Sequence, residues 1–341
     1  MDSSRGSFET AHPRGFFLDP ASRDGLEQYA RDQGWIAPGE ALLSVSKAGE
    51  GNMNLTLRLV TTDKSIILKQ ARPWVEKYPA IEAPAGRALV EAAFYQAVSS
   101  RPAIRAAMPA LLGEDPDSGI LALEDLGEAQ DFTGLYRGEG LSEHDLDALV
   151  SYLVELHRPF PTRQRVFENR EMRALNHEHI FRLPLVPENG LDLDRITPGL
   201  GAAAREMKED EWYVTRVREL GALYLEDGPS LVHGDFFPGS WLRTAGGIRV
   251  IDPEFCFLGI AAFDLGVLLA HLHLSRQPQS LCDGAVGLYG ELARVDADFV
   301  ATARGFAGAE IMRRLIGVAQ LPLEADLERK KALLALSKRL V

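Results

Sequence analysis

Two short segments carry most of the information in this sequence: Leu231-Val-His-Gly-Asp-Phe-Phe-Pro-Gly-Ser-Trp-Leu242 and Val250-Ile-Asp-Pro-Glu254. In each, a short apolar and β-like piece stands next to carboxylates. Asp235 lies in the loop after the first piece, and Asp252 and Glu254 follow the second, with Asp252 17 positions after Asp235. Taken separately, the first segment could be an ordinary turn and the second a strand-end cap. Together, at this spacing, they indicate a functional site.

Carboxylates in this arrangement suit the transfer of a phosphoryl group from ATP. That reaction needs one carboxylate near the acceptor hydroxyl and others that hold Mg²⁺ on the phosphates. We therefore predict that Asp235 is the catalytic base and contacts the substrate. Asp252 and Glu254 would be Mg²⁺ ligands, because that cation prefers oxygen donors.

Length and composition limit the other classes of protein. The chain has 341 residues, of which 46% are hydrophobic and 25% charged, which predicts a globular protein of about two domains. A net charge of −12 argues against nucleic-acid binding. Cys256 and Cys282 match neither a disulfide framework nor a zinc pattern, so we expect buried, reduced thiols. No apolar run approaches the roughly 20 residues of a membrane helix, and no signal peptide is visible, so we expect a cytoplasmic protein without membrane contact.

Hydrophobic patterning predicts a small β-rich lobe followed by a larger helical lobe. After a loosely held arm at 1–20, we expect an N-lobe at 21–126 with a helix at 21–34, β-strands between 41 and 70, a helix at 85–98 and a strand at 119–123. The C-lobe, 127–341, begins with a helix capped by Ser142. Prolines argue against a long helix between 160 and 200. The predicted fold class is α+β.

These motifs resemble those of the kinase-like phosphotransferases, which include aminoglycoside phosphotransferases, choline kinases and methylthioribose kinases. The resemblance covers most of residues 45–320 and implies a two-lobed, protein-kinase-like fold with the nucleotide in the cleft between the lobes. The catalytic loop of the family typically reads His-Gly-Asp with an Asn five positions after the Asp, whereas this chain has Ser240 there. A loop ending in Gly-Ser is similar to that of methylthioribose kinases, as is the metal segment 251–259 followed by Phe263-Asp-Leu-Gly266. Because a hydroxyl is a poorer metal ligand than a carboxamide, Glu254 is favoured over Ser240 as the second metal ligand.

The resemblance also implies roles for residues in the N-terminal half. The segment 49–54 is similar to the loop that covers the phosphates, where glycines let backbone N–H groups approach phosphate oxygens. Lys69 would reach the α and β phosphates, and Glu91 would pair with it, whereas Arg87, one turn earlier, has the wrong charge for that pairing. Main-chain groups at 124–126 would bind the adenine edge. The residues assigned to the nucleotide are Gly49, Gly51, Asn52, Asn54, Lys69, Glu91, Glu124 and Leu126.

In the C-terminal half, we expect Asp264 to accept hydrogen bonds from the backbone around His233 and so to hold the catalytic loop. Arg313 and Arg314 lie on a predicted helix whose apolar stripe would leave both arginines off the core face. From the residues alone they are a solvated charge pair. The resemblance to methylthioribose kinases, which contact the sugar through paired arginines, implies instead that they bind the acceptor.

The resemblance therefore implies transfer of the ATP γ-phosphoryl group to a hydroxyl of a small sugar, such as methylthioribose or a related pentose. Two alternatives stay open. An aminoglycoside or choline acceptor would suit the acidic charge balance, although paired arginines would repel a cation. A catalytically inactive nucleotide-binding regulator would account for Ser240, although Lys69, Asp235, Asp252 and Glu254 are all present. The oligomeric state is open, with a homodimer among the alternatives.

Overall fold

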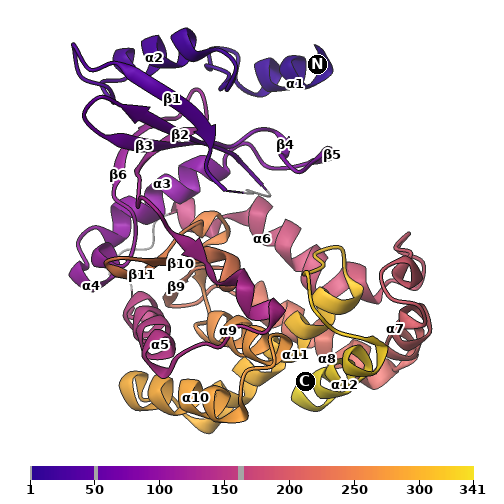
Figure 1. Ribbon diagram of the computed structural model, residues 1–341. Coiled ribbons are helices and arrows are strands. Elements are labelled where there is room, and N and C mark those ends of the chain that lie inside the picture. The colour runs from indigo at the N-terminus through magenta and orange to yellow at the C-terminus, as the bar shows by residue number, and fades with distance from the viewer. Residues whose placement is uncertain (1, 50–52, 160–164) are drawn as a thin grey trace. The chain divides into compact units, whose positions relative to one another are not determined.

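The computed structural model describes residues 2–49, 53–159 and 165–341 and divides the chain into two compact units (Figure 1). Unit 1 comprises Met1–Ala129 and Arg249–Glu254, and unit 2 comprises Gln130–Ile248 and Phe255–Val341. The Asp-Pro-Glu segment, which we expected in the C-lobe, thus belongs to the β-rich unit. The chain passes from one unit to the other three times.

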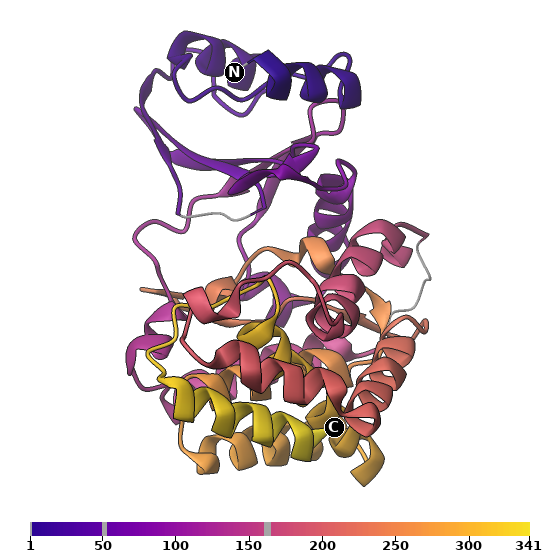
Figure 2. The same ribbon diagram turned by 90° about the vertical axis from the view of Figure 1, so that its right-hand side faces the viewer.

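Unit 1 is built on an antiparallel sheet of strand order β1-β2-β3-β7-β6. In β2, buried leucines alternate with less buried residues, so one face of the sheet is apolar, and α2 (Arg23–Asp32) packs on that face. Helix α3 (Arg87–Val98) lies on the opposite side (Figures 1 and 2). The strands are β1 Leu42–Lys47, β2 Leu55–Thr61, β3 Ser65–Gln70, β6 Leu111–Asp115 and β7 Ile120–Glu124. The short elements are β4 Trp74–Val75, β5 Tyr78–Glu82 and α4 Pro102–Ala106.

Two expectations for unit 1 were wrong. The first residues form α1 (Asp2–Ala11) rather than a loosely held arm, because Phe8 is fully buried and stacks on His12. In α3, the spacing of Leu89, Ala93 and Ala97 predicts an apolar stripe, but Leu89 is 44% exposed. The buried face of that helix instead carries Arg87 and Glu91, which are four residues apart.

Unit 2 is mainly helical, with α9 (Ala262–Leu274) and α11 (Ala297–Ile316) packed together at its centre. Helix α12 (Leu327–Leu340) also packs against α11. Helix α5 (Glu143–His157) begins where predicted, since the side chain of Ser142 accepts a hydrogen bond from the N–H of Asp145. The outer helices include α7 Leu200–Glu209, α8 Glu211–Tyr224 and α10 Gln279–Ala293.

Residues 165–200 are more helical than the prolines of this region suggested. Helix α6 (Arg170–His177) continues into the π-helical segment Glu178–Arg182, and the prolines from Pro184 onward follow this helical stretch. Short strands complete this part of the chain. Strand β9 (Ser230–Val232) pairs with β12 (Phe257–Gly259), and β10 (Trp241–Thr244) lies between β8 (Gln130–Asp131) and β11 (Gly247–Val250), whose last two residues belong to unit 1. Among the described residues, no helix combines the length and apolarity needed to cross a bilayer.

Candidate active site

The loop after β9, which carries Asp235, is held from behind by Asp264 in the first turn of α9. The two carboxylate oxygens of Asp264 accept hydrogen bonds from the N–H groups of His233 (2.6 Å) and Gly234 (3.0 Å), the contact that the sequence predicted. Gly234 has φ +85°, and a Cβ there would lie 2.2 Å from the carbonyl oxygen of Phe255. Only glycine fits, so the backbone before Asp235 has one conformation.

Other buried side chains brace the same loop, and the sequence did not single them out for this role. Nε2 of His157 lies 3.0 Å from Oδ2 of Asp264, and Asn176 donates a hydrogen bond to the carbonyl of Gly234 at 3.0 Å. Ser240, in the 3₁₀ turn Pro238–Ser240, donates to the backbone carbonyl of Asp235 at 3.2 Å. Ser240 is thus a brace of the loop, and its role as a metal ligand stays a prediction.

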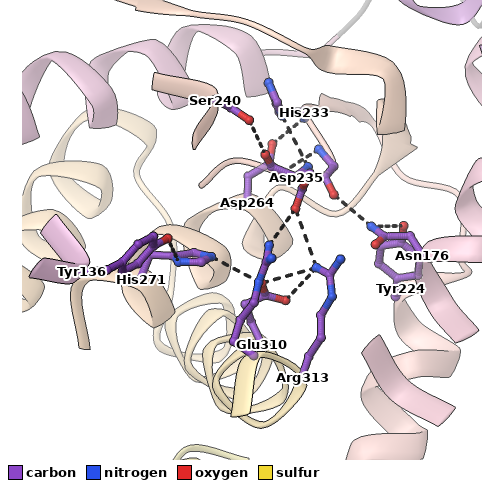
Figure 3. A network of polar contacts seen from close by, with 12 residues as sticks. Tyr136, Asn176, Tyr224, His233, Asp235, Ser240, Asp264, His271, Glu310 and Arg313 are labelled. Atoms are coloured by element: carbon purple, nitrogen blue, oxygen red, sulfur yellow. Dashed lines mark hydrogen bonds and ion pairs between the residues drawn. The ribbon is translucent and has the colours of Figure 1, made fainter. Parts of the chain in front are cut away.

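The carboxylate of Asp235 lies against the arginine pair of α11 (Figure 3). Nη2 of Arg314 is 3.2 Å from Oδ1, and Nη1 of Arg313 is 3.7 Å from the same oxygen. Oδ2 has no hydrogen-bond or ion-pair partner among the described residues. Both arginines are less than 10% exposed, so the expectation that they lie off the core face was wrong. The reason is that α11 is buried on all sides from Gly305 to Ile316.

Glu310, one turn before the arginines, joins them into a network. Its Oε1 accepts from Nε of Arg314 at 2.5 Å, and its Oε2 lies 3.1 Å from Nη1 of Arg313. Burial alone would raise the pKa of Glu310, but the two arginines hold it well below the usual range. Nε2 of His271 lies 3.4 Å from Oε1 of Glu310, and its Nδ1 is 2.7 Å from the hydroxyl of Tyr136. Burial lowers the pKa of His271 to about 4, so the ring is neutral near pH 7.

A second cluster lies in unit 1 around Lys69. Its Nζ is 2.7 Å from Oε2 of Glu91 on α3, the predicted partner, and 2.7 Å from Oδ1 of Asp252. Burial would lower the pKa of Lys69, but Asp252 and Glu91 raise it above its ordinary value, so the amine is charged. Asp252 has φ +62°, a left-handed conformation that Asp and Asn adopt more readily than other residues with a side chain.

Arg87, which its charge excluded as the partner of Lys69, has buried contacts of its own. It does not pair with Lys69, but its fully buried side chain binds Oδ1 of Asn54 (2.9 Å) and Oε2 of Glu254 (3.2 Å). Asn54 also donates to Oε2 of Glu254 at 3.0 Å. The arginine therefore ties the end of the glycine-containing loop to the Asp-Pro-Glu segment. The sequence signal for the burial of Arg87 was its spacing of four residues from Glu91, because residues at this spacing lie on one helix face.

The donor set of unit 1 fits a Mg²⁺ ion that arrives with phosphates. The side chain of Asp252 is 46% exposed, whereas Glu254 is buried with Oε2 already bound by Arg87 and Asn54. Within the described ranges, no group of three or more His, Cys, Asp or Glu side chains could hold a metal by itself. Mg²⁺ commonly takes one or two protein carboxylates and fills its shell with phosphate oxygens and water. Asp252 is the better placed ligand of the two.

The remaining predicted nucleotide contacts stay predictions. Gly49 has φ +79°, which suits a tight loop, while Gly51 and Asn52 lie outside the described residues. The N–H of Glu124 donates to the carbonyl of Ala110 at 2.9 Å, so this donor is already used.

An open cavity of about 800 Å³ occurs elsewhere in unit 2, between α8, α9, α10, α11 and α12. Neither Asp235 nor the arginine pair lines it, so it is separate from the clusters described above.

Comparison with known proteins places these clusters in context. A sequence model of the APH family, described as the phosphotransferase enzyme family, matches residues 44–311. The chain is 28% identical to a methylthioribose kinase of Exiguobacterium sibiricum, over 90% of this chain and 86% of that protein. It is 26% identical to a methylthioribose kinase of Bacillus cereus, over 92% of this chain and 90% of that protein.

Solved structures resemble the chain in fold. A choline kinase from Cryptosporidium parvum superposes with a TM-score of 0.55 at 14% identity, covering 93% of this chain and 96% of that one. A spectinomycin phosphotransferase in complex with ADP and spectinomycin gives 0.54 at 13% identity, covering 93% and 98%. These likenesses confirm the predicted protein-kinase-like phosphotransferase fold and, at such identities, nothing beyond the fold.

Proposed function

The chain belongs to the APH phosphotransferase family, and from this premise we propose that it transfers the γ-phosphoryl group of ATP to a hydroxyl of a small sugar, methylthioribose or a related pentose. The observation that carries the proposal is the environment of Asp235. One of its oxygens is held by two buried arginines, and the other has no partner among the described residues. The methylthioribose kinases among the relatives favour a sugar as the acceptor.

The phosphoryl donor would bind the cluster of unit 1. Lys69, kept charged by Glu91 and Asp252, offers a positive group to the phosphates of ATP. Asp252 would hold Mg²⁺ through its exposed carboxylate. When bound, the ion would offset the negative charge on the phosphate oxygens. Arg87 keeps Glu254 and Asn54 in place beside this site.

The acceptor would bind at Asp235. The acceptor hydroxyl donates a hydrogen bond to Oδ2, and Asp235 takes its proton as the hydroxyl oxygen bonds to the γ-phosphorus. The bond between that phosphorus and the β,γ-bridging oxygen breaks, and ADP leaves. Arg313 and Arg314 lie beside this carboxylate and can stabilise negative charge that develops on the transferred group. Because their positive charges face the acceptor position, a neutral sugar suits the site better than choline or an aminoglycoside.

The test is an assay of ADP release with ATP, Mg²⁺ and a panel of acceptors: methylthioribose, deoxyribose, other pentoses, choline and aminoglycosides. We expect turnover with a pentose and with no cationic acceptor. Asp235→Asn should retain nucleotide binding and lower kcat by about 10²–10⁴-fold, the usual effect of a positioned acid or base. Faster turnover of choline or an aminoglycoside than of any pentose would overturn the acceptor. Nucleotide binding without ADP release for the whole panel would favour a regulator.

A further inference from the structure

Glu310 contacts both arginines of the site, although it lies too deep in α11 to meet a substrate, with only 1% of its surface exposed. We propose that Glu310, backed by His271 and Tyr136, is a positioning residue that keeps Arg313 and Arg314 on one oxygen of Asp235. The other oxygen is thereby left for the acceptor hydroxyl. This inference rests on the proposed function, in which Asp235 is the base.

The charges of the cluster explain why Glu310 is needed. Two guanidinium groups lie between two carboxylates, and each arginine is shared between Glu310 and Asp235. Arginine tends to bind a carboxylate through two parallel hydrogen bonds, one to each oxygen. Without Glu310, Asp235 would be the one carboxylate among the described residues left to both arginines. They would then engage both of its oxygens, and a carboxylate paired in this way accepts a hydroxyl proton poorly.

The helical spacing of α11 allows both arginines to reach Glu310 and Asp235 at once. Arg313 and Arg314 follow Glu310 by three and four residues, the two spacings that bring side chains together on a helix. Nε of Arg314 is used for Glu310 and its Nη2 for Asp235, so one planar group is fixed from two sides. The same guanidinium lies over the ring of Phe237, 4.9 Å from its centroid, which limits rotation out of this plane.

His271 and Tyr136 support Glu310 from its other side. Nε2 of His271 is buried, has no hydrogen-bond partner among the described residues and faces Oε1 of Glu310 at 3.4 Å. We place the ring proton there, because a carboxylate can only accept. Nδ1 then accepts from the hydroxyl of Tyr136 at 2.7 Å. Figure 3 shows Tyr136, His271 and Glu310 following one another in this order, and they come from three separate elements: η1 (Phe132–Arg137), α9 and α11.

The experiment compares Glu310→Gln and Tyr136→Phe with the wild-type chain. Glutamine keeps the size of Glu310 and removes its charge, so the arginines should shift onto Asp235. We expect kcat for the sugar to fall by about 10²-fold, the effect of a small misplacement at a reacting centre, with KM for ATP within twofold of wild type. Tyr136→Phe removes one hydroxyl and should lower kcat in the same direction by severalfold, which keeps the test valid should Glu310→Gln fail to fold.

Ser337→Ala is the matched control. The buried hydroxyl of Ser337 donates to the carbonyl of Gly308 on α11 at 2.6 Å, so its loss should lower Tm without touching the arginines. We expect its kcat to stay within twofold of wild type. The proposal is overturned if Glu310→Gln and Tyr136→Phe both keep wild-type kcat, or if Ser337→Ala loses as much kcat as Glu310→Gln for a similar drop in Tm.

A readout without turnover separates this inference from the proposed function. In ¹⁵N-labelled protein, the Nε–H proton of Arg314 should exchange slowly with water because it is buried and bonded to Glu310. We expect its exchange to accelerate at least tenfold in Glu310→Gln; unchanged exchange would contradict the positioning role. If wild type phosphorylates no sugar, the proposed function fails, and this measurement still decides whether Glu310 holds the arginine.

Discussion

Asp235 and Asp252 are both aspartates next to short strands, but their surroundings give them different chemistry. Asp235 follows a glycine of positive φ and has its Oδ1 beside two buried guanidinium groups. Asp252 itself occupies the left-handed region and has Oδ1 on Lys69, with almost half of its side chain open to solvent. Asp235 thus fits the base of the proposed reaction, and Asp252 fits its proposed Mg²⁺ ligand.

The conformation of Asp252 leads to a prediction about two substitutions. Asn tolerates the left-handed region, whereas Ala there costs about 1–2 kcal/mol. We therefore expect Asp252→Asn to be more stable than Asp252→Ala by about 1 kcal/mol in urea unfolding, although each should lose Mg²⁺-dependent activity. Equal stability of the two variants would show that the backbone relaxes out of the left-handed region. An unchanged Mg²⁺ titration in both would remove Asp252 from the metal site.

Among the elements, the strands and helices with simple periodicity were predictable from the sequence. The alternation in β2 follows from leucines at every second position, and the start of α5 follows from the cap at Ser142. Elements whose buried face carries charge were harder to predict. In α11 that face includes both arginines, which a pattern based on apolar residues placed off the core. In α3 it includes Arg87 and Glu91, and the pairing of Glu91 with Lys69 was expected only from the family resemblance.

The candidate site was predictable where its residues stand close together in the sequence. The segment from His233 to Ser240 and the Asp-Pro-Glu segment are local motifs. The support of the site is not local, because Tyr136, His271 and Glu310 come from three distant elements and meet only in the folded unit. The spacing of these residues in the sequence does not predict that they come into contact. Single polar residues in apolar helices are also common in protein cores, so His271 alone gave no reason to expect a partner on α11.

The burial of His271 on α9 predicts how stability depends on pH. Its pKa is about 4 in the folded protein, against an ordinary value of 6.5, so the unfolded chain binds more protons between these values. The contribution of the neutral ring to the free energy of unfolding is therefore fully present above about pH 6.5, and it is lost as the pH falls toward 4. A shift of this size corresponds to about 3 kcal/mol in the free energy of unfolding.

Urea unfolding of wild type and His271→Asn between pH 7 and pH 4.5 measures this contribution. Wild type should lose more stability than the variant over that range. His144→Asn, which removes an exposed histidine from α5, should behave like wild type. Parallel curves for wild type and His271→Asn would mean that the ring is not held neutral by burial.

For the molecule as a whole, the stability of unit 1 depends on the path of the chain as well as on local structure. Unit 1 is completed by residues 249–254, which the chain reaches only after passing through most of unit 2. Without that segment, the buried Lys69 and Arg87 would lose Asp252 and Glu254 as partners. Removing one partner of a buried ion pair costs about 3–5 kcal/mol. Stable folding of unit 1 thus depends on a segment whose two ends continue into unit 2.

This topology predicts that wild type unfolds in urea as one cooperative transition. The four tryptophans allow a direct test, since Trp35 and Trp74 lie in unit 1 and Trp212 and Trp241 in unit 2. The variants W212F/W241F and W35F/W74F each keep tryptophan fluorescence in one unit only. We expect their unfolding midpoints to coincide, once the effect of each pair of substitutions on overall stability has been corrected for by circular dichroism.

Arg87→Met, which removes the contact with Glu254, should move the midpoint of unit 1 to a lower urea concentration and so separate the two transitions. Arg105→Met, an exposed change on α4, should leave the two midpoints together. Separate midpoints in otherwise wild-type protein would contradict the prediction, because they would mean that unit 1 loses its structure while 249–254 is still held by its neighbours in the chain.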